Sequence, residues 1–236
     1  MKLTSKSAKN TLLSFANSDK AQVLRRFFKT DKGQYAEGDI FIGVMVPVTR
    51  RIAKTYANLP LTETEKLLKS KEHEARLLAL FIMKIQFDKG TAEAQKKIHH
   101  LFLNNIRFIN NWDLVDLSAP TLVGEFLANK NKNLLYKLSR SKNLWERRIA
   151  IIATFAFIRN NEPSETFKIS AKLLNDKHDL IHKAVGWMLR EAGKRDIKKE
   201  EAFLRKYYSR MPRTMLRYAI ERFPERKRKA YLRGEI

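Results

Sequence analysis

The sequence predicts an all-α protein whose helices stack as a superhelical solenoid of repeats. Apolar residues recur at helical rather than alternating spacing through most of the 236 residues. Residues that favour helices dominate, and glycine occurs only eight times. Segments that place a polar or aromatic residue ahead of an apolar helix also recur about every 35 residues, the period of a stacked helix pair.

The repeated segments predict five helices in chain order. Stacked helix pairs bury a continuous core and leave one layer of helices on a concave surface. We therefore expect one domain over residues 1–236, with a concave face along it. The five segments contain Arg76, Trp112, Arg148, Lys183 and Arg217.

Proline and glycine mark the connections between the predicted helices. Residues 30–47 hold Gly33, Gly38 and Gly43 and resist a helical interpretation, so we expect an ordered loop there. Because long loops often carry function, this one either lines the binding face or only connects two helices. The prolines expected to begin or end helices are Pro47, Pro60, Pro120, Pro163, Pro212 and Pro224.

The charge balance indicates what the protein binds. With 48 Lys and Arg residues against 25 Asp and Glu, the formal net charge is +23. This excess indicates a polyanionic partner, with nucleic acid ahead of an anionic membrane. The longest apolar run, residues 149–158, is too short to cross a bilayer. The absence of cysteine excludes disulfides and thiolate zinc sites, and we expect a cytoplasmic protein.

The first chemically informative segment surrounds Trp112. Either Asn110 or Asn111 can cap a helix that runs to Pro120, and Asp116 then lies one turn after Trp112 on the same face. An indole beside a carboxylate could stabilise a positively charged reacting centre. The alternative is that Trp112 packs in the core and Asp116 only supports helix packing.

The second segment covers residues 181–195 and predicts a helix with two stripes. The apolar stripe faces the core, whereas a basic stripe with a tryptophan in it is typical of nucleic-acid contacts. The alternative is that this tryptophan covers the margin of the core. The apolar stripe contains Ile181, Ala184, Val185, Met188 and Ala192, and the basic stripe contains Lys183, Trp187, Arg190 and Lys194.

A third segment, Trp145-Glu146-Arg147-Arg148, leads into an apolar helix over residues 149–158. Arg148 is either a solvated flank of that helix or, on an inner helix layer, a ligand for a phosphate. His178 and His182 share a helical face, but no third ligand is evident, so we expect no metal site. The chain also lacks the glycine-rich motifs of nucleotide-binding proteins.

Several motifs together resemble the DNA-alkylation-repair family of HEAT-like-repeat DNA glycosylases. The resemblance spans nearly the whole chain, and the motifs occur in the family's order. They are Phe27-Phe28-Lys29-Thr30, Glu37-Gly38-Asp39, Gly43-Val44-Met45-Val46-Pro47, Trp112-Asp113-Leu114-Val115-Asp116, Trp145-Glu146-Arg147-Arg148 and residues 183–190, Lys-Ala-Val-Gly-Trp-Met-Leu-Arg, followed by Glu191.

The resemblance implies a monomeric enzyme that binds duplex DNA in a basic concave groove of HEAT-like repeats. It would excise N3-alkyladenine and N7-alkylguanine without a cofactor and without a base-binding pocket. By the matching motif positions, Asp116 is the catalytic carboxylate, Trp112 and Trp187 contact the lesion deoxyribose, and Arg148 binds a phosphate. The residues expected to bind DNA are Arg148, the cations of the basic stripe and Phe27. The cations of the stripe are Lys183, Arg190 and Lys194.

The chain departs from the family pattern in one place. Where typical members have a tyrosine that faces the DNA, this sequence has Phe27 or Phe28. The hydroxyl is therefore lost or has moved, for instance to Tyr35. Some relatives with this fold bind branched DNA without excising bases, so a non-catalytic DNA-structure binder is the main alternative. A more distant one is a scaffold for protein partners.

Overall fold

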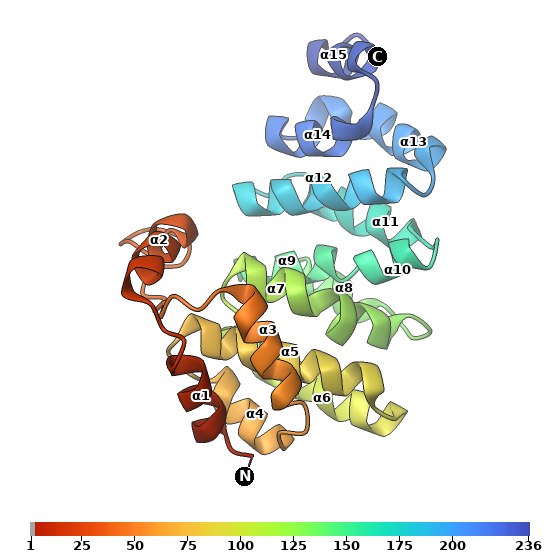
Figure 1. Cartoon of the computed structure of the whole chain (residues 1–236). Coiled ribbons are helices and arrows are strands. Elements are labelled where there is room, and N and C mark those ends of the chain that lie inside the picture. The colour runs from red at the N-terminus through yellow and green to blue at the C-terminus, as the bar shows by residue number, and fades with distance from the viewer. Residues whose placement is uncertain (1–2) are drawn as a thin grey trace. The chain divides into compact units, whose positions relative to one another are not determined.

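The computed structural model describes residues 3–236 and contains helices but no strand within that range (Figure 1). The expected all-α class is therefore confirmed. The chain divides into two compact units, unit 1 over residues 1–122 and unit 2 over residues 123–236. No described helix is long and apolar enough to span a membrane.

Unit 1 is built around α5 (His73–Lys89). Every residue of α5 from 73 to 83 is buried, because α3, α4, α6 and α7 all pack against it. A helix that is apolar on all sides is expected at the centre of a unit. The other helices of unit 1 are α1 (Ser5–Leu13), α2 (Ser18–Phe28), α3 (Val46–Thr55), α4 (Leu61–Leu68), α6 (Ala92–Asn104), η1 (Ile106–Phe108) and α7 (Trp112–Ala119).

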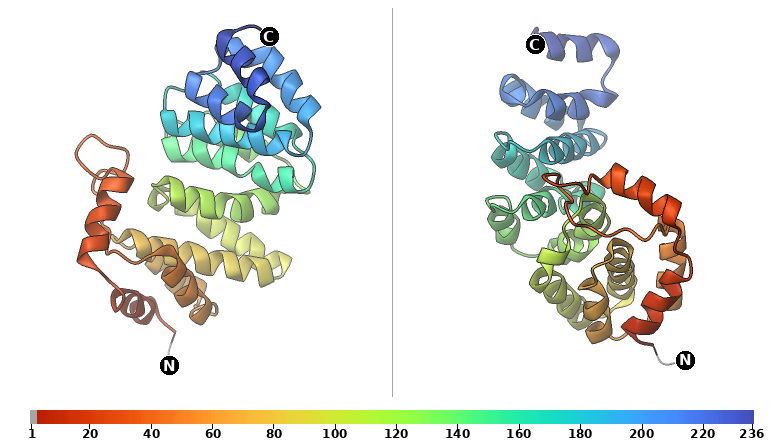
Figure 2. Two further views of the ribbon diagram at one scale, coloured as in Figure 1. Left: turned by 45° about the horizontal axis from the view of Figure 1, so that its top comes forward. Right: turned by 90° about the vertical axis from the view of Figure 1, so that its left-hand side faces the viewer.

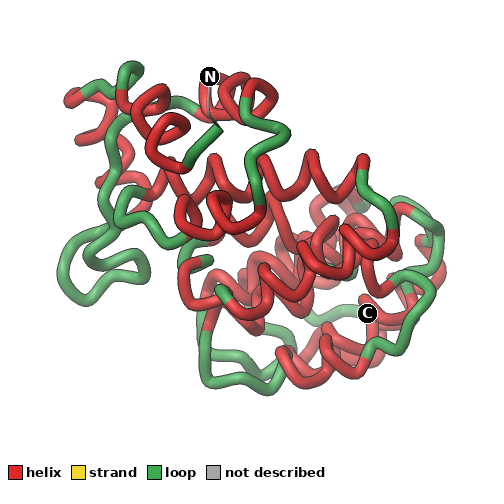
Figure 3. The backbone as a smooth tube through the Cα atoms, turned by 90° about the horizontal axis from the view of Figure 1, so that it is seen from below, coloured by secondary structure: helices red, strands yellow, loops and turns green. Residues whose placement is uncertain are grey.

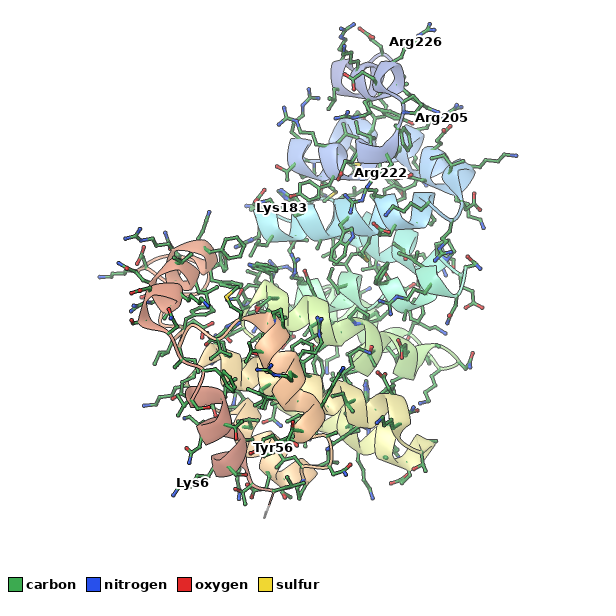
Figure 4. All side chains as sticks on the ribbon, in the orientation of Figure 1. Lys6, Tyr56, Lys183, Arg205, Arg222 and Arg226 are labelled. Atoms are coloured by element: carbon green, nitrogen blue, oxygen red, sulfur yellow. The ribbon has the colours of Figure 1, made fainter. Side chains whose placement is uncertain are left out.

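Helix α1 is tied to the rest of unit 1 by polar contacts. The hydroxyls of Thr11 and Tyr56 lie 2.8 Å apart, and Tyr56 is buried beneath α1 (Figure 4). The backbone amide of Ser5 donates to the carboxylate of Glu63 on α4 over 2.7 Å. These contacts fix the start of the described chain onto α3 and α4.

The expected ordered loop is present between α2 and α3, over residues 29–45. The Glu74 carboxylate anchors it by accepting the backbone amides of Ile42, Gly43 and Val44. Gly43 has φ +83°, and a Cβ atom there would lie 2.0 Å from the carbonyl oxygen of Asn17. Only glycine tolerates both the positive φ and the close approach of the Asn17 carbonyl, so Gly43 fixes the backbone of the loop at this point.

Unit 2 is built around α12 (Asp179–Gly193), which packs against α9, α11, α13 and α14 (Figure 2). A Cβ atom on Gly186 would lie 2.4 Å from the carbonyl oxygen of Met215, so glycine allows the backbones of α12 and α14 to approach closely. The other helices of unit 2 are α8 (Asn133–Leu138), α9 (Leu144–Ile152), α10 (Phe155–Arg159), α11 (Ser164–Leu173), α13 (Ile197–Tyr207), η3 (Tyr208–Arg210), α14 (Arg213–Ala219), η4 (Ile220–Arg222) and α15 (Glu225–Arg233).

The prediction of one continuous helix over residues 149–158 was wrong. Helix α9 ends at Ile152 and α10 begins at Phe155, with a turn between them. The carbonyl of Ala153 faces Gly124 so closely that a Cβ atom on Gly124 would lie 2.2 Å from it. Apolar periodicity continues through the turn, because residues on both sides of it are buried.

The repeated segments correspond to five helices that other helices separate along the chain. Helices α5, α7, α9, α12 and α14 begin at residues 73, 112, 144, 179 and 213. Four prolines directly precede a helix, and a short π-helical segment, η2 (Pro120–Glu125), follows α7. The connections between helices are short apart from the loop at residues 29–45, as the tube in Figure 3 shows.

Candidate active site

Helix α7 carries two of the residues predicted to act on a substrate. Asn111 caps it, because its side-chain oxygen accepts a 2.8 Å hydrogen bond from the backbone amide of Trp112. Trp112 and Asp116 lie one turn apart, and each is partly exposed. The indole and the carboxylate therefore share one face of α7.

Trp112 is held on two sides. Its ring stacks on Phe28, with ring centroids 5.1 Å apart and an angle of 23° between the planes. Phe27 meets the same indole edge-on at 6.0 Å and is itself 62% exposed. The indole nitrogen donates a 3.2 Å hydrogen bond to the hydroxyl of Tyr35. Trp112 thus lies at the margin of unit 1 with both its ring and its N–H engaged.

Tyr35 is the residue named above as one possible place for the hydroxyl that Phe27 and Phe28 lack. It belongs to the loop at residues 29–45, and its hydroxyl reaches the indole of Trp112. A hydroxyl is therefore present beside Trp112, although neither phenylalanine carries one. The loop thus places one side chain against Trp112, and whether it lines a binding face remains a prediction.

A buried network of charges lies behind Trp112. His73 is 1% exposed, and its Nδ1 and Nε2 each lie 2.8 Å from a carboxylate oxygen, of Asp39 and Asp113 respectively. Arg76 donates to the other oxygen of Asp39. Two cations and two carboxylates thus alternate within unit 1.

The network keeps His73 protonated. Burial alone lowers the pKa of His73, but the charges and hydrogen bonds of Asp113 and Asp39 outweigh it and raise the pKa to about 9. Burial has the opposite effect on Asp39 and raises its pKa, but the hydrogen bonds and charges of His73 and Arg76 outweigh burial and hold the pKa of Asp39 below its ordinary value. At neutral pH the histidine is therefore an imidazolium between two carboxylates.

These contacts hold the first turn of α7. Asp113 follows Trp112 directly, and the Asn111 side-chain amide lies 3.5 Å from the Asp39 carboxylate. Sequence reasoning missed this network. Asp39 and Asp113 stand inside the motifs that carry the resemblance, but nothing in the sequence connects them to His73.

Arg148 lies on α9 in unit 2 and is 5% exposed. Its guanidinium donates to the backbone carbonyl of Leu180 at the start of α12, so it joins α9 to α12. The neighbouring Arg147 pairs with Asp176 through Nε at 2.6 Å. The phosphate contact expected of Arg148 remains a prediction.

Helix α12 has the two stripes that the sequence predicts. The five residues of the apolar stripe are completely buried. Trp187 is partly exposed, and its ring centroid lies 6.0 Å from that of Phe155 on α10. Trp112 and Asp116 belong to unit 1, whereas Arg148 and Trp187 belong to unit 2.

The cations of the basic stripe already have carboxylate partners within unit 2. Lys183, which projects from the first half of α12 in Figure 4, pairs with Asp179 at 2.7 Å. Lys194 pairs with Glu191 at 2.8 Å. Arg190 pairs with the same Glu191 and with Glu221 of η4. A phosphate that binds this stripe therefore competes with carboxylates.

The two histidines considered for metal binding have other partners. His178 caps α12 by accepting the backbone amide of Leu180, and the ring of His182 bonds the carbonyl of Asp176. Residues 3–236 contain no group of three or more metal-ligating side chains of the His, Cys, Asp and Glu type.

A solved structure described as a "Predicted DNA alkylation repair enzyme from Enterococcus faecalis" is similar to this chain. The two share 17% identity with a TM-score of 0.70, over 89% of this chain and 97% of that one. This likeness shows the helical-repeat fold. No curated protein sequence matches the chain. The family model described as DNA alkylation repair enzyme matches residues 8–223, nearly the whole length. The chain therefore belongs to the DNA alkylation repair enzyme family.

Proposed function

We propose that the protein excises cationic N-alkylated purines, N3-alkyladenine and N7-alkylguanine, from duplex DNA. The observation that carries this proposal is the shared face of α7. Trp112 is fixed there by Phe28 and Tyr35, and Asp116 follows one turn later. A carboxylate beside an electron-rich ring suits a cationic sugar better than it suits a phosphate backbone.

The reaction needs no general acid, because an alkylated purine already carries a positive charge. The N-glycosidic bond breaks and its electron pair returns to the base, which leaves neutral, while the sugar becomes oxocarbenium-like. Water then attacks the anomeric carbon and releases one proton. A carboxylate about 4 Å from the developing charge contributes about 4 kcal/mol at an effective dielectric near 20, roughly a thousandfold in rate.

The remaining residues expected to contact DNA lie in unit 2. Trp187 is the ring expected to meet the lesion deoxyribose together with Trp112, and Arg148 is the expected phosphate ligand. The net charge of +23 supports duplex DNA as the partner. Because the leaving base is already activated, the proposal requires neither a cofactor nor a pocket for the base.

Release of free base from methylated duplex DNA tests this function. The protein is incubated with duplex that contains N7-methylguanine, and the free base is separated and quantified. Release above the spontaneous rate supports the enzyme. Tight duplex binding without release would instead establish the alternative, a non-catalytic DNA-structure binder of the same family.

A further inference from the structure

Two arginines occupy equivalent positions in α5 and α9. Arg76 lies six residues after Ser70 and five residues after Lys71. Arg147 has the same spacing from Ser141 and Lys142. Arg76 Nη1 donates to the carbonyls of Ser70 and Lys71 over 3.1 and 2.9 Å. Arg147 Nη1 does the same to Ser141 and Lys142, over 3.0 Å each. Each guanidinium thus closes the turn that precedes its helix.

The two arginines differ in what meets their remaining nitrogens. Arg147 binds Asp176, 29 residues later, with Nε at 2.6 Å and Nη2 at 3.4 Å. The residue 29 positions after Arg76 is the neutral Asn105, whose amide donates instead to Glu65 and to the carbonyl of Leu101. Arg76 Nη2 reaches Asp39, but its Nε has no hydrogen-bond partner.

An unpartnered guanidinium N–H is unusual at this depth. Arg76 is 4% exposed, and a buried donor ordinarily has an acceptor. The acceptor that Asp176 provides in unit 2 is missing at the matching place in unit 1. Asp39 satisfies only Nη2, so the Nε of Arg76 still lacks the oxyanion acceptor that the Nε of Arg147 has.

The space beside Arg76 is a basic pocket that lies wholly in unit 1. No carboxylate lines it, and Lys71 and Arg107 are exposed at its edge. Lys69 also lines it and pairs with Glu65 at 2.6 Å. The remaining lining residues are Ser70, Phe108 and Asn110.

Asn110 provides a second polar group without a partner. Its side-chain oxygen is buried and has no hydrogen bond. Rotation of the amide by half a turn would present its NH2 group as a donor at the same place. The pocket is thus lined by Arg76, whose Nε is buried and unpartnered, by the exposed cations Lys71 and Arg107, and by the Asn110 amide, and these groups can supply the donors of an oxyanion site.

We propose that this pocket binds a phosphate group, with Arg76 Nε as the buried donor and Lys71 and Arg107 as the outer cations. The phosphate oxygen takes the place that the Asp176 carboxylate occupies at Arg147. The phosphate comes either from a nucleic-acid backbone or from solution as free phosphate. The backbone source rests on the proposed function, whereas phosphate binding itself does not.

Arginine side-chain NMR tests the site directly. Inorganic phosphate is titrated into 15N-labelled protein while the Nε–Hε signals of Arg76 and Arg147 are followed. We expect the Arg76 signal to shift saturably as phosphate is added. The Arg147 signal should not shift, because the Nε–H of Arg147 already donates to the Asp176 carboxylate. An unmoved Arg76 signal, or equal shifts at both arginines, would overturn the proposal.

Matched variants locate the outer cations. Lys71→Ala and Arg107→Ala should each weaken phosphate binding by roughly tenfold, since each removes one charge-assisted contact. Lys177→Ala is the control, because Lys177 lies beside Arg147 in the corresponding pocket of unit 2, where the carboxylate is present. A loss in the control as large as in the variants would contradict the assignment.

Duplex DNA distinguishes the two sources of phosphate. The logarithmic dependence of DNA affinity on salt is measured for the parent and for Arg107→Ala. A slope that is shallower by about one identifies a backbone phosphate, and an unchanged slope identifies free phosphate. The phosphate titration contains no DNA and no alkylated base, so its result stands even if the protein excises nothing.

Discussion

The charges beside α7 in unit 1 and those along α12 in unit 2 differ in burial. In unit 1 the His73 imidazolium is buried between Asp39 and Asp113, next to the first turn of α7. In unit 2 the cations of α12 lie near the surface and pair with carboxylates, as Lys183 does with Asp179. Breaking a buried pair strands a charge away from water, whereas a surface pair exchanges partners at little cost. We infer that the buried charges of unit 1 hold the Trp112 ring in one position. We also infer that the cations of α12 in unit 2 can exchange their carboxylate partners for phosphates.

Replacing His73 should have the largest effect on stability. His73→Ala leaves Asp113 without its buried partner, so we expect the free energy of unfolding to fall by about 3–5 kcal/mol. Urea denaturation of the variant and the parent measures the difference. Lys183→Ala is the control in unit 2 and should change stability by less than about 1 kcal/mol. Equal losses in the two variants would remove the contrast between the units.

The pH dependence of stability sharpens the same contrast. The pKa of His73 is about 9 in the folded state, above the value near 6.5 of an unperturbed histidine. Its stabilising effect is therefore complete below about pH 6.5 and is lost as the pH rises through 9. The loss is on the order of 3 kcal/mol. Denaturation midpoints of the parent should fall over this range, whereas those of His73→Gln should lack this component. Parallel curves for the two proteins would contradict a protonated His73.

Removing the Tyr35 hydroxyl should have a smaller effect on stability than the loss of His73. Tyr35→Phe deletes the acceptor of the Trp112 indole N–H but keeps the ring. The loss of one hydrogen bond should lower the free energy of unfolding by no more than about 1 kcal/mol, and a less firmly held indole should slow base release by about fivefold. Phe27→Tyr, made in the Tyr35→Phe variant, tests whether a hydroxyl on the exposed ring of residue 27 restores the rate of base release. Unchanged release by Tyr35→Phe would show that Trp112 does not depend on this contact.

The smallest expected effect lies on α12 and has the opposite sign. Asp179→Asn frees Lys183 from its ion pair and should tighten duplex binding by about twofold to threefold, because phosphate no longer competes with a carboxylate. Fluorescence anisotropy at several salt concentrations measures the change. Asp196→Asn, which frees Lys199 of α13 instead, is the matched control. The same tightening in both variants would mean that net charge alone, and not contact by Lys183, determines the affinity.

The sequence predicts what depends on local periodicity. The stripes of α12 follow from residues three and four positions apart, and the cap at Asn111 follows from one side chain beside its own helix. The same local logic failed at residues 149–158. Apolar residues continue on both sides of the turn, and the close approach of Gly124 to the Ala153 carbonyl joins positions far apart in the sequence.

The parts of the site that join distant residues could not be predicted from one sequence. His73 meets Asp39 and Asp113 from positions 34 and 40 residues away, and no spacing rule connects them. The Lys183–Asp179 pair was visible in the sequence as a four-residue spacing, but the pairing of Arg190 with Glu221 was not. Tyr35 was an expected alternative place for the hydroxyl, yet only the path of its loop brings it to Trp112.

The charge of Asp116 is the centre of the functional account. Asp116→Asn keeps the shape of the side chain and removes the charge that would face the oxocarbenium-like sugar. Single-turnover release of N7-methylguanine from duplex DNA should fall by roughly 10²–10³ fold, while lesion DNA binds as tightly as before or slightly more tightly. Trp187→Ala is the comparison, because this variant should reduce both DNA binding and the rate of base release, whereas Asp116→Asn should reduce the rate alone. Release by Asp116→Asn at the rate of the parent would contradict the catalytic assignment.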